Sequence, residues 1–401
     1  MSTCKIYLKP KEEMRISQGH SWVYSNEIDH IDGFIKSGEI AHVYNSKGAF
    51  IGKGFLNTSS KIFVRILSRD ENEVIDEKFF FDIILSAQQS RVDLGYSNSY
   101  RVLFGEADGV PGLIVDKYGE YLSIQILSLG IDIRREMLLK ILVDIFKPKG
   151  IYERSDVNVR KKEGLELFKS VVYGEVPDLI LIQENQLLME VDIKDGQKTG
   201  SFLDQQDNHN AIKPYVKGKN VLDCFSYIGG FGLHAAFYQA KSVTCIDLSD
   251  CAVIQVERNA KLNHFNNVKA IKADVFAALR NYQNENKFFD VVILDPPAFA
   301  KKKEDVNKAY QGYKEINLQA MKITNDNGYL ITCSCSHYMT PSLFLEMLMD
   351  AANDAKKIAQ MIEFRIQGKD HPALLGSDES LYLKCVVLKI KSSDKKVEIH
   401  Q

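Results

Sequence analysis

The sequence predicts an α/β protein in which a small β-rich domain and a small α+β domain precede a doubly wound C-terminal domain with a parallel sheet. Three observations support this fold class. Strand and helix patterns alternate regularly from about residue 195 onward. Short strand-like runs broken by turn residues fill the first 70 residues. The length of 401 residues, with 45% apolar and 26% charged residues, suits two or three soluble globular domains.

The N-terminal region is predicted to consist mainly of β-strands. Strand-like runs lie at 5–8, 38–44, 49–55 and 62–67. Gly48, Gly52 and Gly54 punctuate these runs, as glycines at turns and bulges do. We therefore expect a β-rich domain over residues 1–70, followed by a polar linker at 69–77.

The middle of the chain mixes both periodicities. Apolar residues recur at intervals of three and four residues over 78–95, which predicts a helix. The segment 132–146 has the pattern of an amphipathic helix. Strands are predicted at 100–104, 112–115, 121–127 and 151–154, with a hairpin at 180–192. A basic, polar stretch lies between them at 155–163. We expect a small α+β domain over residues 75–192.

The C-terminal half shows the pattern of a parallel sheet covered on both faces. Strands are predicted at 220–225, 243–247, 268–272, 290–295 and 328–333. Helices are predicted between them, at 230–238, 250–263, 275–283 and 306–324. The tail adds a helix at 341–357 and strands near 361–366 and 381–390. We expect one Rossmann-like domain over residues 195–401.

Charge and cysteine content bound the function. The formal net charge is −2, so a surface that binds nucleic acid would have to be a local basic patch. The seven cysteines are odd in number and lack zinc-finger spacing, so no metal site is predicted. The sequence begins without an apolar signal segment and contains no apolar run of roughly 18 residues. We expect a cytoplasmic protein with reduced thiols and no membrane span.

Aspartates follow the predicted strands of the C-terminal domain. Asp223, Asp247, Asp274 and Asp295 occupy four successive strand ends. In a doubly wound sheet these ends face the ligand crevice, and an acid after the second strand can accept hydrogen bonds from ribose hydroxyls. In the alternative interpretation, Ser249 and Asp274 simply cap helices, as serines and aspartates often do. Four aspartates in register favour a ligand site over capping alone.

The glycine loop argues against a dinucleotide oxidoreductase. The loop VLDCFSYIGGFG carries Gly229, Gly230 and Gly232 but only loosely matches the phosphate-binding fingerprint. It is instead aromatic and hydroxyl-bearing. The following Asp295-Pro296-Pro297 has no role in hydride transfer. These features favour a cofactor that carries ribose and adenine without phosphate.

Several motifs together resemble one known family. The glycine loop, Asp247, Asp274 and DPPAF are similar to motifs I to IV of class I methyltransferases. Further matches are KPKEEMRISQGHSWVYSNEI to an N-terminal PUA domain, GEADGVPGLIVDKYG to a central domain, and TGSFLDQQDNH, SCSH and DHPALLGSDESLYLK in the catalytic part. The whole pattern resembles the ribosomal RNA large subunit methyltransferase I family, which makes 5-methylcytosine in 23S rRNA. The resemblance spans nearly the entire chain.

The resemblance implies S-adenosyl-L-methionine as the cofactor and 23S ribosomal RNA as the partner. It also implies that the chain can form a homodimer. The implied cofactor contacts are Thr199, Phe202, Asp204, Gln205, Asp223, Phe225, Ser226, Tyr227, Gly229, Gly230, Asp247, Leu248, Ser249, Asp274, Val275, Asp295 and Pro296. The chain departs from the family where Gln206 and His209 replace two arginines.

The implied chemistry requires a cysteine that ionises. Carbon 5 of cytosine becomes nucleophilic only after a thiolate adds to carbon 6. Cys335 matches the cysteine of the family's SCS motif and is the candidate nucleophile, with Asp295 placed to hold the cytosine. Cys333 is interpreted as a buried strand residue, and His337 either assists ionisation or is a bystander. DPPAF contains no second cysteine, so the base that removes the carbon 5 proton is left open.

Local basic residues are candidates for RNA contacts, either by phosphate binding or as an ordinary solvated face. They are Lys9, Arg15, Arg154, Arg160, Lys161, Lys301 and Lys302. Phe299 and Tyr338 are candidates for stacking on a flipped base, with core packing as the alternative.

Three other functions stay open. An N-methyltransferase could hold an amino group at the DPPAF motif and would not need Cys335. A non-catalytic RNA-binding or assembly factor would bind RNA without cofactor turnover. A small-molecule methyltransferase would leave the first 195 residues without a role.

Overall fold

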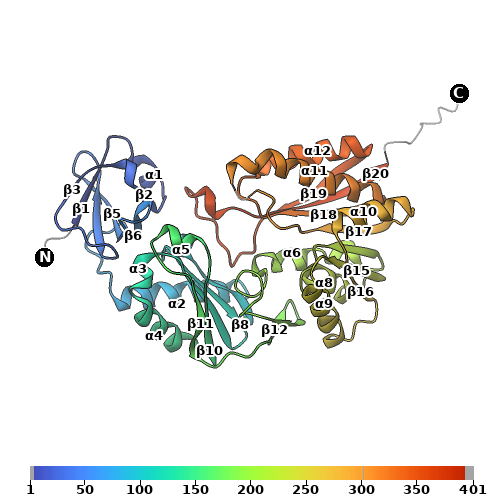
Figure 1. Ribbon diagram of the computed structural model, residues 1–401, viewed down its shortest axis with the longest axis horizontal. Helices are drawn as coiled ribbons and strands as arrows, with labels where there is room; N and C mark the ends of the chain where they lie inside the picture. The colour runs from blue at the N-terminus through green and yellow to red at the C-terminus, as the bar shows by residue number, and fades with distance from the viewer. Residues whose placement is uncertain (1–3, 301, 393–401) are drawn as a thin grey trace. The chain divides into compact units, whose positions relative to one another are not determined.

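The computed structural model describes residues 4–300 and 302–392, which form two compact units (Figure 1). Unit 1 comprises Met1–Ile182, Val191–Asp204 and Lys369–Ser380. Unit 2 comprises Gln183–Glu190, Gln205–Gly368 and Leu381–Gln401. The segments at 195–204 and 369–380, which the sequence pattern assigns to the C-terminal domain, belong to unit 1.

The first part of unit 1 is a six-stranded sheet, as the β-rich pattern predicts. Its strands are β1 (Cys4–Leu8), β2 (Trp22–Tyr24), β3 (Ile28–Asp32), β4 (Ile40–Tyr44), β5 (Phe50–Leu56) and β6 (Ile62–Ser68). Their order is β2-β6-β5-β4-β1-β3, and only the β1–β4 pair is parallel. A short helix, α1 (Glu13–Ser17), follows β1. Buried apolar residues such as Ile6, Val43 and Val64 form its core.

The second part of unit 1 is a five-stranded sheet in the order β11-β10-β9-β8-β7. The strands are β7 (Ser99–Phe104), β8 (Leu113–Tyr118), β9 (Tyr121–Ile126), β10 (Gly150–Ser155) and β11 (Phe168–Gly174). The helices are α2 (Glu77–Asp93), α3 (Leu129–Asp132), α4 (Arg135–Phe146) and α5 (Val159–Lys162). Residues of α2 and α4 share one buried apolar cluster with this sheet.

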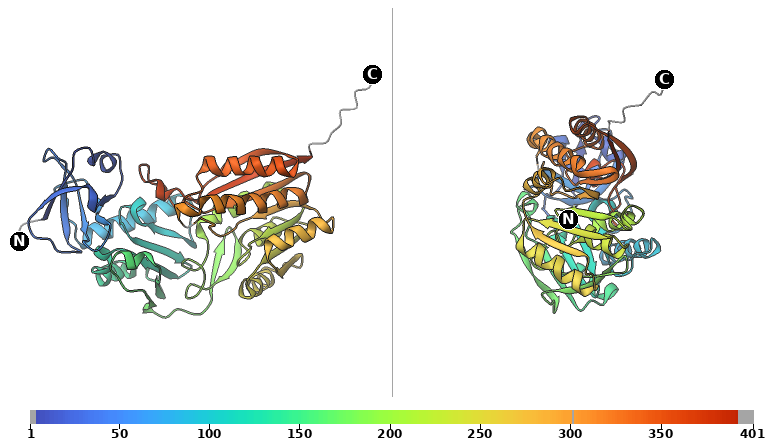
Figure 2. Two further views of the ribbon diagram at one scale, coloured as in Figure 1. Left: turned by 45° about the horizontal axis from the view of Figure 1, so that its top comes forward. Right: turned by 90° about the vertical axis from the view of Figure 1, so that its right-hand side faces the viewer.

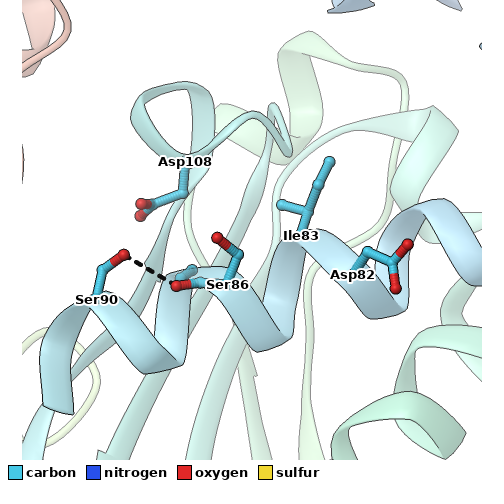
Figure 3. A pocket seen from close by; sticks show the side chains of 6 residues that line it. Asp82, Ile83, Ser86, Ser90 and Asp108 are labelled. Atoms are coloured by element: carbon cyan, nitrogen blue, oxygen red, sulfur yellow. Dashed lines mark hydrogen bonds between the residues drawn. The ribbon is translucent and has the colours of Figure 1, made fainter. Parts of the chain in front are cut away.

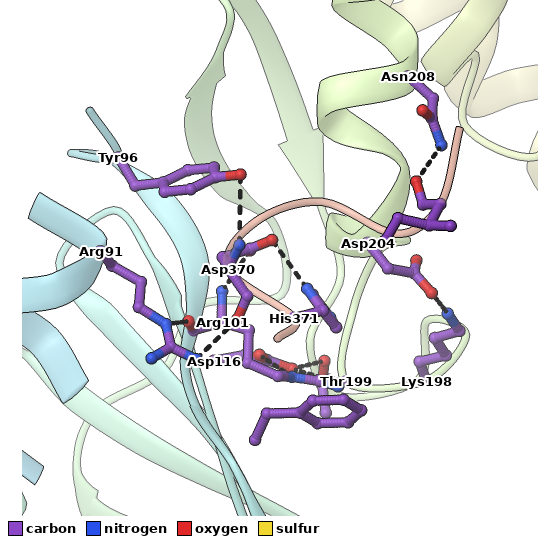
Figure 4. Close-up of polar contacts among 12 residues, drawn as sticks. Arg91, Tyr96, Arg101, Asp116, Lys198, Thr199, Asp204, Asn208, Asp370 and His371 are labelled. Atoms are coloured by element: carbon purple, nitrogen blue, oxygen red, sulfur yellow. Dashed lines mark hydrogen bonds and ion pairs between the residues drawn. The ribbon is translucent and has the colours of Figure 1, made fainter. Parts of the chain in front are cut away.

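A buried polar network ties the later segments of unit 1 to its five-stranded sheet (Figure 4). Arg101 forms a bidentate ion pair with Asp116 at 2.8 Å, and its backbone N–H donates to Asp370 Oδ2. Arg91 donates to the carbonyl oxygen of Asp370 at 2.9 Å. Thr199 donates to Asp116 Oδ2 at 2.6 Å. Buried charges are tolerated here because they are paired and hydrogen-bonded.

Unit 2 contains a seven-stranded sheet in the order β16-β15-β14-β17-β18-β20-β19. Its strands are β14 (Asn220–Cys224), β15 (Ser242–Asp247), β16 (Val268–Lys272), β17 (Phe289–Leu294), β18 (Thr324–Ser334), β19 (Lys357–Arg365) and β20 (Lys384–Ser392). Its helices are α6 (Gln206–Ala211), α7 (Lys213–Val216), α8 (Gly230–Phe237), α9 (Asp250–Leu262), α10 (Val275–Asn284), α11 (Val306–Ile323) and α12 (Pro341–Ala355). The predicted hairpin is β12 (Ile180–Glu184) and β13 (Leu187–Val191).

Helices cover both faces of this sheet, as the strand–helix alternation predicts. Along β17, Val291 and Ile293 contribute to the cluster with α7, α8 and α9, while Val292 and Leu294 contribute to the cluster with α10, α11 and α12. Figure 2 shows α11 and α12, in orange, running side by side along one face. Such two-sided burial explains why β17 is apolar without interruption from Val291 to Leu294.

The sheet is mixed rather than wholly parallel. The five strands β14 to β18 are parallel, but β20 lies antiparallel between β18 and β19. The alternation of strands and helices ends at α12, and β19 and β20 then follow each other without a crossover helix. Parallel neighbours need such a crossover, so consecutive strands without one pair antiparallel.

Candidate active site

The carboxyl ends of four neighbouring parallel strands meet at one edge of the unit 2 sheet. In register, Cys224 of β14 pairs with Ile246 of β15 and with Leu294 of β17. Asp223 therefore lies one residue before this row of paired residues, and Asp247 and Asp295 lie one residue after it. This is the edge at which doubly wound sheets bind ligands.

The loop after β14 has an unusual backbone. Phe225, Tyr227 and Gly229 all have positive φ angles, of 62°, 47° and 94°. Bulky residues rarely adopt this region, and such strain is found where surrounding structure holds it for function. The Ser226 N–H donates to the Ile246 carbonyl at 3.1 Å, which anchors the loop to β15. A Cβ at Gly229 would lie 2.7 Å from Leu233, so the turn requires glycine.

Asp223 supports this loop from below. Its side chain is buried and accepts a hydrogen bond from the Gly232 N–H at 2.8 Å. Burial raises the pKa of Asp223 to about 7, the Gly232 N–H lowers it in part, and the charge of Asp295 raises it further. With 1% of its surface exposed, Asp223 contributes to this edge of the sheet by holding the loop.

Asp247 faces the same loop from β15. Its carboxylate accepts the Tyr227 N–H at 2.9 Å and the Ser249 N–H at 3.0 Å. Each carboxylate oxygen can accept a further hydrogen bond, so Asp247 retains capacity for hydroxyl donors. The neighbouring Leu248 is 65% exposed, which leaves an apolar surface beside the carboxylate. A carboxylate next to an exposed leucine suits a ribose with an attached flat base.

Two candidate residues cap helices, as the alternative interpretation holds. Ser249 accepts from the Ala252 N–H at 3.4 Å at the start of α9, and Asp274 accepts from the Ala277 N–H at 2.9 Å at the start of α10. Both side chains are exposed, whereas Val275 is buried. Capping occupies one oxygen, so it does not exclude a ligand contact by the other oxygen of Asp274.

Asp295 is held by the α6 region of unit 2. Gln205 donates to Asp295 Oδ1 at 2.9 Å, and Asn208 donates to Gln205 Oε1 at 2.7 Å. Asp295 is half-buried and Pro296 is buried. The hydrogen bonds from Asn208 to Gln205 and from Gln205 to Asp295 fix the Asp295 carboxylate at the carboxyl end of β17.

The motif TGSFLDQQDNH at 199–209 also contains Thr199, Phe202 and Asp204, which lie in unit 1. Thr199 is buried and bonded to Asp116 and to the Tyr118 hydroxyl at 3.1 Å. Asp204 pairs with Lys198 at 2.6 Å, and the Lys198 ammonium lies 4.6 Å from the centre of the Phe202 ring. The motif therefore divides between the two units at Asp204 and Gln205.

Cys335 lies on the turn that follows β18, the strand next to β17. Its side chain is half-buried, whereas Cys333 is buried in the strand. Cys333 lies opposite Cys385 of β20 in the strand register, and both thiols are free. Burial raises the pKa of Cys333 well above its ordinary value, which disfavours its thiolate. The two flanking serines of Cys335 are buried, and the Ser336 hydroxyl lies 3.0 Å from the Tyr313 hydroxyl.

The aromatic candidates differ in exposure. Phe299 is half-buried and packs on Tyr313, with ring centres 4.5 Å apart, so it belongs partly to the core. Tyr338 is 38% exposed and meets the exposed His337 edge-on. Tyr338 is therefore the more accessible of the two rings.

The candidate RNA-contacting residues fall into two groups. Arg154 and Arg160 are buried, and their guanidinium groups donate to main-chain carbonyls of unit 1. Arg15 is half-buried and pairs with Glu27 at 2.6 Å. The lysines at positions 9, 161 and 302 are exposed. Lys301 lies outside the described residues.

Two further features do not stand out in the sequence analysis. A shallow pocket of about 320 Å³ lies along α2 in unit 1 (Figure 3). It is lined by Asp82, Ile83, Ser86, Ala87, Ser90 and Asp108. Asp108 is already paired with Arg91, so we assign the pocket no role. The second feature is Lys384, a buried lysine at the start of β20, whose signal is a charge within the apolar run LYLKCVVLKI.

A helix that crosses a bilayer needs about 20 mostly apolar residues. Among residues 4–300 and 302–392, no helix combines the length and apolar character of a membrane-spanning segment.

Comparisons with known proteins agree with this architecture. Residues 6–69 match the PUA-like domain family, and residues 205–338 match the family described as conserved hypothetical protein 95. Two solved structures superpose on nearly the whole chain. One is a candidate SAM-dependent methyltransferase from Streptococcus mutans, with a TM-score of 0.81, 22% identity and coverage of 96% of this chain and 99% of that one. The other is a candidate methyltransferase complexed with SAH, with a TM-score of 0.82, 23% identity and the same coverage.

Two full-length relatives are more similar in sequence. Ribosomal RNA large subunit methyltransferase I of Aliivibrio fischeri is 42% identical over 388 residues, which cover 95% of this chain and 98% of the relative. The protein of the same name from Aeromonas salmonicida is 40% identical over 393 residues, covering 96% and 99%. The chain therefore belongs to the ribosomal RNA large subunit methyltransferase I family.

Proposed function

We propose that this protein is an S-adenosylmethionine-dependent methyltransferase that acts on RNA of the large ribosomal subunit, and that it methylates carbon 5 of a cytosine through Cys335. The observation that carries the proposal is the position of the Cys335 thiol. It lies half-buried just beyond β18, while Asp295 follows the adjacent parallel strand β17. A nucleophile and a carboxylate thus flank one edge of the sheet.

The residues at this edge fit the cofactor. Asp247 retains acceptors for ribose hydroxyls, the exposed Leu248 suits one face of adenine, and the strained loop at 225–229 brings the main chain close to a ligand. Gln205 and Asp295 lie at the next strand end, toward Cys335. When bound, S-adenosylmethionine supplies a methyl group on a positively charged sulfur.

Cys335 and Asp295 take separate roles in the proposed chemistry. The Cys335 thiolate adds to carbon 6 of the cytosine, which makes carbon 5 nucleophilic. Asp295, held by Gln205, accepts a hydrogen bond from the amino group of the base and orients the ring. After methyl transfer, loss of the carbon 5 proton returns the electrons that expel the thiolate. The buried Cys333 takes no part in this scheme.

An RNA substrate is supported by three observations. The N-terminal residues match a PUA-like domain, the relatives are ribosomal RNA methyltransferases by name, and the lysines at positions 9, 161 and 302 are exposed. Exposed lysines suit phosphate contacts, which position an RNA without reading its sequence.

The test is a methylation assay with labelled S-adenosylmethionine and unmodified, protein-free 23S ribosomal RNA, followed by nucleoside analysis. We expect the label in 5-methylcytosine and its loss in Cys335→Ala. Cys251→Ala is the matched control, because Cys251 is an exposed thiol at the start of α9. Full activity of Cys335→Ala would refute the thiolate mechanism.

N-methyl transfer to an exocyclic amino group is the second candidate. The ordered Asp295 carboxylate before Pro296 favours it, because that carboxylate can hold an amino group without any thiol. Label in an N-methylated base, with Cys335→Ala still active, would establish this alternative. Absence of transfer to naked RNA, with cofactor binding intact, would instead direct the search to an assembled particle or to a non-catalytic role.

A further inference from the structure

Lys384 is a buried cation beside the proposed nucleophile. It begins β20 and pairs with Ser334 at the end of β18, the residue immediately before Cys335. Only 3% of Lys384 is exposed. Lysine is almost never buried to this extent unless it has a partner, so its position requires an explanation.

The ammonium group of Lys384 is attached to the turn that carries Cys335. Nζ donates to the carbonyl oxygen of Ser336 at 2.7 Å and to that of Tyr382 at 2.9 Å. The Ser336 carbonyl is one residue beyond Cys335, so Nζ lies against the same turn. Two carbonyls occupy two of its three N–H donors, which leaves one donor for another acceptor.

Among the residues that the structure describes, no carboxylate forms an ion pair with this cation. Burial lowers the pKa of Lys384 to about 8, and the negative charge of an ionised Cys335 acts in the opposite direction. Among the described residues, the Cys335 thiolate is therefore the anion that acts on the ammonium.

We propose that Lys384 is a positioning residue that holds the Cys335 turn and stabilises the thiolate form of Cys335. This inference rests on the proposed function, in which Cys335 is the nucleophile. In the resting enzyme the Lys384 ammonium and the Cys335 thiolate form an ion pair. When the thiolate adds to carbon 6 of the cytosine, the ammonium keeps its hydrogen bonds to the carbonyl oxygens of Ser336 and Tyr382. When the thiolate leaves the product, the same ammonium stabilises it as the leaving group.

Other titratable groups lie near the turn that carries Cys335. Tyr313 on α11 has a pKa raised by burial, lowered in part by the hydroxyls of Ser334 and Ser336, and raised by the Cys335 charge, so it stays neutral. His337 is exposed on the same turn. Asp295, beyond the adjacent β17, contributes negative charge near this strand end, since its charge raises the pKa of Cys333. Lys384 is a buried positive group beside the turn.

The experiment measures the ionisation of the Cys335 thiol directly, without RNA. Alkylation by iodoacetamide is followed by mass spectrometry of the Cys335 and Cys251 peptides between pH 5.5 and 10 in the full-length enzyme. Cys251 is exposed and serves as an internal reference thiol. We expect the Cys335 profile to lie at least about one pH unit below the Cys251 profile.

Lys384→Met keeps the length of the side chain and removes the charge, and Lys384→Arg keeps the charge. We expect Lys384→Met to shift the Cys335 profile upward by about one unit or more and to leave Cys251 unchanged. We expect Lys384→Arg to restore most of the shift. With RNA, Lys384→Met should lower kcat, with partial recovery at high pH and little change in the KM for RNA.

Two results would overturn the proposal. One is a wild-type Cys335 profile that coincides with that of Cys251, which requires no variant. The other is an unchanged profile in a Lys384→Met variant that melts like the wild type. A fully active Cys335→Ala variant would instead remove the proposed function, and the alkylation profiles would still report whether Lys384 stabilises the thiolate.

Discussion

His209 Nδ1 lies 2.6 Å from Oε1 of Glu184, and both side chains are buried in unit 2. The His209 imidazole packs against Gly230, directly after the loop at 225–229, since a Cβ on Gly230 would lie 2.5 Å from His209 Cε1. His234 joins the cluster, with its Nε2 3.8 Å from Glu184 and its Nδ1 2.6 Å from the Gly230 carbonyl. Burial lowers the pKa of His234 to about 4, so it is neutral. The resemblance places an arginine at position 209, and here a histidine supplies the positive charge.

The Glu184–His209 pair should make the stability of unit 2 depend on pH. Burial alone would lower the pKa of His209, but the charge and hydrogen bond of Glu184 raise it overall. The protonated histidine therefore stabilises the fold fully below the unfolded pKa of about 6.5, and this contribution is lost as pH rises through the folded pKa. Burial alone would raise the pKa of Glu184, but His209 lowers it. Its contribution is lost as pH falls through that lowered value.

His209→Gln tests this dependence. We expect the variant to be less stable than the wild type by about 2 kcal/mol near pH 6, and the difference to shrink above the raised His209 pKa, because a neutral imidazole and an amide then offer similar donors. Hydrogen exchange of peptides within 183–190 and in α6 reports on unit 2, whereas the single tryptophan, Trp22, lies in unit 1. His30→Gln, at an exposed site, is the control. A difference that is constant with pH would contradict the prediction.

Gly232→Ala should damage the cofactor loop. The added Cβ would lie 2.4 Å from Cys245 Sγ and 2.8 Å from Asp223 Oδ2, both of which are buried. We expect destabilisation by about 1–3 kcal/mol and at least about tenfold weaker binding of S-adenosylhomocysteine in titration calorimetry. Gly218→Ala is the control, because its φ of +70° costs about 1 kcal/mol in strain while no atom lies within 4 Å of the new Cβ. Equal binding losses in the two variants would argue against a specific role of Gly232.

Asp247→Asn should weaken cofactor binding with little effect on folding. The amide replaces a carboxylate oxygen that accepts a loop N–H and, in the proposed complex, a ribose hydroxyl. We expect Kd for S-adenosylhomocysteine to rise about 10- to 100-fold, or about 1.4–2.7 kcal/mol. Asp250→Asn is the matched control, since Asp250 is exposed three residues away and pairs with Lys272. An unchanged Kd in Asp247→Asn would remove the ribose assignment.

The sequence predicts much of unit 2, for a physical reason. Continuous apolar runs in strands such as β17, and glycines where φ is positive, leave local signatures in a sequence. Long-range pairing leaves no such signature. The antiparallel position of β20, the membership of 369–380 in unit 1 and the Lys384 contacts all join residues far apart in the chain.

Basic residues illustrate the same limit. Arg160 and Lys161 are adjacent and equivalent in a charge pattern, yet Arg160 is buried and donates to the Ile126 carbonyl at 2.6 Å, while Lys161 is exposed. Composition does not reveal which cations have protein acceptors. Only the fold shows which of them remain available to phosphate.

Exposed lysines and the buried Arg160 should respond differently to replacement. Replacing the lysines at positions 9, 161 and 302 by glutamine should weaken RNA binding and reduce the slope of log K against log salt by about 0.7–0.9 for each phosphate contact removed. Arg160→Gln should instead lower stability by about 2–4 kcal/mol, because it leaves buried carbonyl groups and Asp132 without their donor. Its salt slope should match the wild type when measured below the unfolding transition. Filter binding to 23S ribosomal RNA over a salt series distinguishes the two, and a lysine triple variant with an unchanged slope would show that its solvated face does not meet RNA.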